Sequence, residues 1–167
     1  LEGIQSPSMI RFMEQMEDAS SELAEIETVL QARFPQFADI EIPPRLTNSV
    51  TLSTMHGCPP DEIEEICRYL LAERGLHTFV KLNPTLLGKD VVLRILHDDL
   101  GYHEIQIPDA VFEHDLQYNR ALELIRSLKQ TADERGLTFG VKLSNTLAMA
   151  NHRDRLPGDE MYMSGRA

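Results

Sequence analysis

The sequence predicts an α/β fold, a partial TIM-type (β/α) barrel with parallel strands that follows an N-terminal helical segment. From residue 49 onward, strand-like runs alternate with amphipathic helical stretches. Strands that alternate with helices of this length need right-handed crossovers and therefore a parallel sheet. Polar residues gather directly after successive strands, where the active sites of barrels lie. This placement favours a barrel over an open doubly wound sheet.

Residues 1–48 are expected to form two core-packing helices and a linker. Apolar residues recur at intervals of three and four in both helices, which is the spacing of a buried helix face. These residues are Met9, Phe12, Met13 and Met16 in the first helix and Leu23, Ile26, Val29 and Leu30 in the second. Ser20 or Ser21 can cap the second helix, and Pro35 ends it. A short strand is expected at 39–42 in the linker.

Residues 49–167 are assigned to the partial barrel. Pro60 suits the first turn of a helix because its missing N–H would be unpaired there, and Gly75 suits the end. The apolar face of this helix is formed by Ile63, Ile66, Cys67, Leu70 and Leu71. The expected strands are 49–54, 78–82, 104–107 and 138–143, and the other expected helices are 89–100 and 116–135.

Bulk properties exclude several classes of protein. A net charge of -11 argues against nucleic-acid binding, which needs a surplus of lysine and arginine on one face. No apolar run approaches the ~18 residues of a membrane span. Two cysteines and no signal peptide indicate a reducing, cytoplasmic location, and two cysteines cannot supply the roughly four ligands of an iron–sulfur cluster. The missing initiator methionine and the final MYMSGRA suggest a piece of a longer protein.

The chemistry is expected in the stretch TLSTMHGCPPD at 51–61. Cys58 lies between a strand and a helix N-terminus, whose dipole lowers a thiol pKa and so favours a thiolate nucleophile or a general base. His56 could tune it or hold a substrate. In the alternative interpretation, Cys58 fills a proline-stiffened turn and His56 is an exposed loop residue. Cys67 is expected in the core, and the spacing of these residues fits no strong zinc signature, so no metal site is predicted.

Two further strand ends carry similar polar residues. Lys81 and Lys142 lie in strands otherwise made of Phe, Val and Leu, and a lysine there must reach a polar cavity or extend to solvent. Asn83, Asn145 and Thr146 follow at the strand ends, where amide groups can pair with a planar heterocycle. All three strand ends are expected to face one site.

Four segments carry a resemblance to a known family: TLSTMHGCPPDEIEEICRYLL, HTFVKLNPTLLG, FGVKLSNT and LPGDEMYMSGRA. Together they resemble the "putative selenate reductase iron–sulfur subunit" family, long bacterial oxidoreductases with a flavin- and NAD(P)H-binding half. The region is similar, more loosely, to the flavin barrel of dihydroorotate and dihydropyrimidine dehydrogenases. The resemblance implies FMN in a complete barrel, none in this piece alone, and FAD, NAD(P)H and iron–sulfur clusters elsewhere in the parent protein.

The same resemblance implies roles for individual residues. Cys58 and Pro59 are similar to a Cys-Pro motif that supplies the catalytic base in the flavin barrels. The strand that ends in Lys81, Leu82, Asn83 and Pro84 is similar to one that contacts FMN. Asn145 and Thr146 are similar to a pair that binds the pyrimidine, and Ser164 and Gly165 to a loop that borders the flavin.

Two departures from the flavin barrels affect these roles. Lys81 and Asn145 are 64 positions apart (145 − 81) with an extra strand and helix between them, so Lys142 is an alternative counterpart of the FMN-contacting lysine. The asparagine that precedes the Cys-Pro motif is replaced by His56 and Gly57.

Three hypotheses follow. In the first, the chain is part of a flavin oxidoreductase in which Cys58 handles a proton and Lys81 or Lys142 lies near the flavin. In the second, it is a degenerate barrel that docks the other domains or subunits of its parent without chemistry of its own. In the third, weaker one, Lys81 or Lys142 forms a Schiff base. A homodimer could cover exposed barrel edges.

Overall fold

The computed structural model describes residues 1–37, 39–54, 57–143 and 145–163. The chain divides into two compact units, Leu1–Ser49 and Val50–Ala167. None of the helices in the described ranges has the length and apolar character needed to cross a membrane.

The first unit contains α1 (Pro7–Glu17), α2 (Ser20–Arg33) and a short 3₁₀ turn, η1 (Pro35–Phe37). Both predicted helices are confirmed. The predicted cap on α2 is wrong: the N-cap is Ala19, and Asp18 instead accepts hydrogen bonds from the backbone N–H and hydroxyl of Ser20. The chain returns along α1, where the backbone N–H groups of residues 46 and 47 both bond to one carbonyl of that helix.

Two further expectations for this unit are wrong. The second helix does not bury its whole apolar face, because Leu23 is buried while Ile26 and Val29 are about half exposed. Residues 39–42 form no strand. A strand needs a neighbour to pair with, and the backbone N–H of Ile40 instead closes a turn onto the carbonyl of Phe37.

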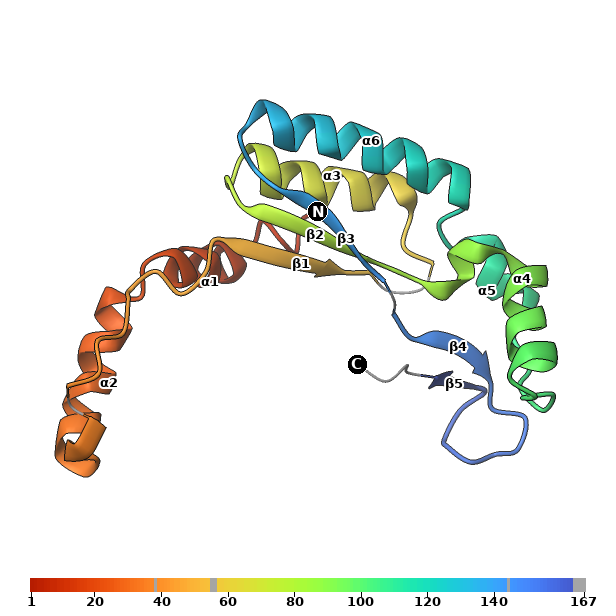
Figure 1. Cartoon of the computed structure of the whole chain (residues 1–167), viewed down its shortest axis with the longest axis horizontal. Coiled ribbons are helices and arrows are strands. Elements are labelled where there is room, and N and C mark those ends of the chain that lie inside the picture. Colours follow the sequence, from red (N-terminus) through yellow and green to blue (C-terminus); the bar gives the residue numbers. More distant parts are fainter. Residues whose placement is uncertain (38, 55–56, 144, 164–167) are drawn as a thin grey trace. The chain divides into compact units, whose positions relative to one another are not determined.

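The second unit is built on a three-stranded sheet in the order β1-β2-β3. Its strands are β1 (Ser49–Ser53), β2 (His77–Leu82) and β3 (Phe139–Leu143). β2 and β3 are parallel and aligned residue for residue, from Thr78 beside Phe139 to Leu82 beside Leu143. Figure 1 shows α3 (Pro60–Ala72) and α6 (Tyr118–Glu134) side by side over one face of this sheet. The result is a mixed α/β fold with parallel strands, consistent with a partial TIM barrel.

The core lies between this face and the two helices. Each helix presents an apolar stripe, and alternate residues of the strands complete the layer. The buried residues are Ile63, Cys67, Leu71, Val80, Leu82, Leu124, Leu128, Ala132 and Phe139. Cys67 is fully buried, as expected, and this burial raises the pKa of its thiol to about 12.

The connection from β2 to β3 is longer than a simple crossover. It contains η2 (Pro84–Leu87), a 3₁₀ turn; α4 (Lys89–Leu93), which continues as the π-helical turn η3 (Arg94–Asp99); and α5 (Asp109–His114) before α6. The helix predicted at 89–100 is confirmed as α4 with η3. The helix α5 was not predicted.

The strand predicted at 104–107 is wrong. Its Ile107 is buried against a second cluster with Val92, Leu96, Phe112 and Leu147, rather than in the sheet. A backbone bond from Ala150 N to Gln106 O (2.8 Å) ties this segment to the chain that follows β3. That chain forms an antiparallel hairpin of β4 (Leu147–Ala150) and β5 (Glu160–Met163), which was not predicted.

Candidate functional site

A buried carboxyl group joins three loops at the carboxyl end of the sheet. Asp115, 5% exposed, directly follows α5. Its Oδ1 accepts a hydrogen bond from Gly57 N (2.8 Å), and its Oδ2 accepts bonds from Asn83 Nδ2 (3.1 Å) and Thr85 Oγ1 (2.7 Å). Buried polar groups need such partners, so this carboxyl fixes the loop after β1 against the loop after β2.

The bonds continue from Asn83 to the end of β3. Asn145 donates from Nδ2 to Asn83 Oδ1 (2.8 Å) and to Thr54 O (3.3 Å). Thr54 in turn donates its hydroxyl to Lys81 O (3.4 Å). We call Thr54, Gly57, Asn83, Thr85, Asp115 and Asn145 the Asp115 network. All three predicted strand ends meet in this network.

The turn between α5 and α6 holds Asp115 in place. Gln117, the residue before α6, donates its side-chain amide to Asp115 O (2.9 Å) and to Phe112 O (2.7 Å). The amide therefore satisfies carbonyls at the end of α5 that have no partner within the helix. These two bonds fix the backbone that carries the Asp115 carboxyl group.

A small cavity lies inside the network. Its volume is about 10 Å³, roughly the space of one water molecule. Cys58 lines it together with Asp115, Asn83 and Thr85 from the network. The apolar side is closed by Ile63, Leu82, Leu86 and Leu116. Cys58 thus lies next to the polar network. Its side chain is partly buried and packs against the edge of the apolar core.

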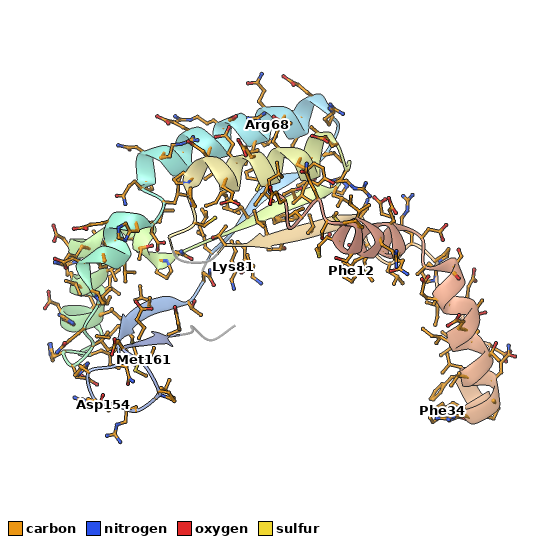
Figure 2. The ribbon with its side chains drawn as sticks, turned by 180° about the vertical axis from the view of Figure 1, so that it is seen from behind. Phe12, Phe34, Arg68, Lys81, Asp154 and Met161 are labelled. Carbon is orange, nitrogen blue, oxygen red and sulfur yellow. The ribbon has the colours of Figure 1, made fainter. Side chains whose placement is uncertain are left out.

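The two lysines lie beside each other on the face of the sheet opposite the helices. Lys81 and Lys142 occupy paired positions of β2 and β3, one residue out of phase with the buried Val80 and Leu82. Lys81 is half-buried and Lys142 is exposed. Figure 2 shows Lys81 on the side of the sheet that faces away from α3 and α6. In a closed barrel this face is the interior.

Comparison with known proteins identifies the family. All 167 residues, 1–167, match the family described as "Oxidoreductase YgfK, N-terminal TIM-barrel domain". The chain belongs to this family. Two relatives named "Putative oxidoreductase YgfK", from Escherichia coli K12 and Escherichia coli O157:H7, are each 46% identical over 186 residues. The chain is covered completely, and it spans 18% of the length of each relative. No solved structure matches.

These matches confirm part of the resemblance. The YgfK family carries the oxidoreductase class and the TIM-barrel domain that the sequence segments implied. Neither relative's name mentions selenate or an iron–sulfur subunit.

The pKa of the Cys58 thiol is shifted in the direction opposite to the one expected from the helix dipole. Burial raises the pKa of this thiol, and the negative charge of Glu62 raises it further. The N-terminus of α3 does not overcome these effects, because the sulfur packs against apolar side chains and the first turn of the helix is itself acidic. The raised pKa favours the protonated thiol over the thiolate at Cys58.

The structure places the other predicted site residues as follows. Asn83 and Asn145 bond to each other, and Asn145 Oδ1 accepts a bond from Thr146 N (2.9 Å). The amides of Asn83 and Asn145 therefore belong to one connected set of hydrogen bonds.

Three further predicted site residues, His56, Ser164 and Gly165, lie outside the described residues. Within the described ranges, no group of three or more His, Cys, Asp or Glu side chains could hold a metal ion.

Sequence reasoning missed the centre of the site. Asp115 stands in a run with other acids, and no role was assigned to any of them. The signal that could have identified Asp115 is its position in the sequence. Asp115 lies between the apolar Phe112 and Leu116 and directly before a strong helix pattern. Apolar neighbours on both sides indicate a segment that packs against the core, so an acidic residue within it is a candidate for an inward-facing side chain.

Proposed function

We propose that the chain forms the flavin-binding barrel face of an oxidoreductase, with Cys58 as a proton donor. The observation that carries this proposal is that Cys58 lines a cavity of the Asp115 network at the carboxyl ends of adjacent strands, and that the network reaches the backbone carbonyl of Lys81. Barrel enzymes build their active sites at this end. Membership of an oxidoreductase family supports the reaction class.

The chemistry of the donor set fits a flavin. Two lysines in paired positions give one face of the sheet a concentration of positive charge, although the chain as a whole carries -11. Such charge suits the electron-rich edge of a flavin ring and its phosphate. Lys81 and Lys142 would hold the cofactor, and the flavin when bound supplies hydride transfer. FAD, NAD(P)H and iron–sulfur centres enter the proposal only as electron carriers outside residues 1–167.

Cys58 would supply the proton that accompanies the hydride. Because its pKa is raised, the thiol is protonated at neutral pH and suits reduction of a substrate double bond. Asp115 acts as a positioning residue: it bonds the backbone of Gly57, the neighbour of Cys58, and does not need to touch the substrate.

The test uses the full-length protein. After incubation with FMN and removal of free cofactor, the protein is denatured and its released flavins are separated by chromatography, which distinguishes FMN from any FAD held outside residues 1–167. FMN is expected in the parent protein, and Lys81→Ala or Lys142→Ala is expected to abolish it, which identifies the functional lysine. Lys129→Ala removes the same charge from an exposed position on α6 and is expected to retain the FMN. Bound FMN is also expected to protect Cys58 from alkylation.

A second candidate is a scaffold without chemistry of its own. It is favoured by the way the amides of Asn83 and Asn145 bond to each other and to Asp115, around a cavity with room for about one water molecule. Under this function the network only ties strand ends together. A full-length protein that retains no FMN after incubation with an excess of it, with Cys58 alkylated at the same rate with and without FMN, would support the scaffold and overturn the flavin proposal.

A further inference from the structure

A larger cavity lies beside the β4–β5 hairpin, away from the Asp115 network. Its volume is about 520 Å³, and it shares no lining residue with the small cavity. This size falls within the range of about 300–1,000 Å³ that is typical of small-molecule sites. One wall is the segment 102–106, and the other is the hairpin with its connecting loop. Figure 2 labels Met161 on β5 and Asp154 on the loop.

The wall chemistry is apolar with a charged margin. Ile105, Met149 and Met161 supply flexible apolar surface that adapts to a flat ligand. Arg153 and Arg155 also line the cavity. No described residue forms an ion pair with either guanidinium, in contrast to Arg68 and Arg120, which are paired on the helices. Two unpaired guanidiniums beside an apolar wall are suited to an organic anion.

The loop that carries these arginines is held by a buried side chain. Asn151, 4% exposed, donates from Nδ2 to Leu156 O (2.5 Å) and Gly158 O (2.7 Å). Its Oδ1 accepts a bond from Arg155 N (2.9 Å), and its backbone N–H bonds to Asp159 O (2.8 Å). One amide thus closes the loop from both sides, so that the arginines start from a fixed backbone. Preorganisation of this kind lowers the cost of binding.

One acidic residue limits the charge of the ligand. Glu104 lines the same cavity, so Arg153, Arg155 and Glu104 together carry a formal charge of about +1. A ligand with a single negative charge is balanced by this set. A phosphate ester with nearly two charges meets repulsion from Glu104.

We propose that this cavity binds an aromatic monocarboxylate, with the ring against Met149 and Met161 and the carboxylate on Arg153 and Arg155. The proposal does not depend on the flavin site, because the two cavities are lined by different residues.

The test is calorimetric titration of the full-length protein with 2-naphthoate, 2-naphthol and 2-naphthyl phosphate. 2-Naphthoate is expected to bind at one site. The double variant Arg153→Ala/Arg155→Ala is expected to weaken the affinity for 2-naphthoate about tenfold or more. The affinity for the uncharged 2-naphthol is expected to change by about twofold or less. The control Arg126→Ala/Arg135→Ala removes the same charge from exposed positions on and after α6, and is expected to bind 2-naphthoate like the parent.

Two comparisons of affinity test the role of Glu104. The phosphate is expected to bind more weakly than the carboxylate, and Glu104→Gln is expected to narrow that difference. The proposal is overturned if 2-naphthoate shows no binding at millimolar concentration, if the Arg153/Arg155 double variant binds it as well as the parent does, or if the phosphate binds more tightly. Unchanged circular dichroism of the variants shows that lost binding is not lost folding.

Discussion

Two carboxyl groups in the second unit each collect several hydrogen bonds, yet their surroundings differ. Asp115 is 5% exposed and accepts bonds from three uncharged donors, one in the loop after β1 and two in the segment after β2. Glu64 lies on α3, with its side chain 17% exposed, and accepts bonds from Arg68 of the same helix and from Arg120 and Ser127 of α6. The first network is buried at the strand ends, and the second lies on the outer surface of the helices. The Asp115 network therefore forms the candidate site. The bonds of Glu64 to Arg68, Arg120 and Ser127, which we call the surface brace, hold α3 against α6.

The largest effect is expected from Asp115→Ala. The substitution leaves Gly57 N–H, the Thr85 hydroxyl and the Asn83 amide without their shared acceptor in a buried place. Unsatisfied buried donors cost roughly 1–3 kcal/mol each, so the free energy of opening this region should fall by about 3 kcal/mol. Hydrogen exchange of peptides that cover 57–63 and 83–87 in the full-length protein measures it. Unchanged protection would show that the network does not fix these loops.

Glu64→Ala should have a smaller effect. It removes the acceptor shared by Arg68, Arg120 and Ser127, but both arginines are partly exposed and can turn to water. The expected loss is about 1 kcal/mol, confined to exchange in α3 and α6. A loss as large as that of Asp115→Ala would remove the distinction between the two networks.

The stabilising contribution of Glu64 should also depend on pH. Burial raises the pKa of Glu64, but hydrogen bonds from Arg120, Ser127 and Arg68 outweigh burial and hold the pKa below its ordinary value. Its stabilising contribution is therefore complete at neutral pH and above, and is lost as the pH falls through the lowered pKa, below about 4.3. As the pH falls over this range, the protection of α3 amides relative to their intrinsic exchange rate at each pH should decrease in the parent and change little in Glu64→Ala. Equal pH profiles would contradict the assignment.

The two cysteines should differ in reactivity without any change in stability. Burial raises the pKa of Cys58, and raises that of the fully buried Cys67 to about 12. Iodoacetamide is therefore expected to label Cys58 slowly at pH 7 and faster as the pH rises, and to label Cys67 only after unfolding. Mass spectrometry of the native protein over a pH series checks the order. Labelling of Cys67 first would contradict the core packing.

Elements with a strong local pattern could be predicted from the sequence. The helix Pro60–Ala72 has five apolar residues at helical spacing, a proline at its start and a glycine, Gly75, with φ of 67° after its end. The strands β2 and β3 were predicted from short runs of apolar residues, each with a lysine. In both cases the information lies within the segment itself.

Elements that depend on distant partners could not be predicted. The bond from Gly57 to Asp115 spans 58 positions and depends on α5, a six-residue helix too short to leave a periodic pattern. The β4–β5 hairpin has strands of four residues, and its loop is closed by Asn151 rather than by a two-residue turn. The raised pKa of Cys58 follows from its packing, which the position before a helix does not reveal.

The most direct test of the central claim is the alkylation rate of Cys58 at pH 8 in the parent, Asp115→Ala and Glu64→Ala forms of the full-length protein. If the Asp115 network holds the loop that buries this thiol, Asp115→Ala should expose the thiol, lower its pKa and speed alkylation about tenfold. Glu64→Ala should leave the rate within about twofold of the parent, because the surface brace does not reach the loop. Equal rates in all three proteins, or an equal increase in both variants, would contradict the account.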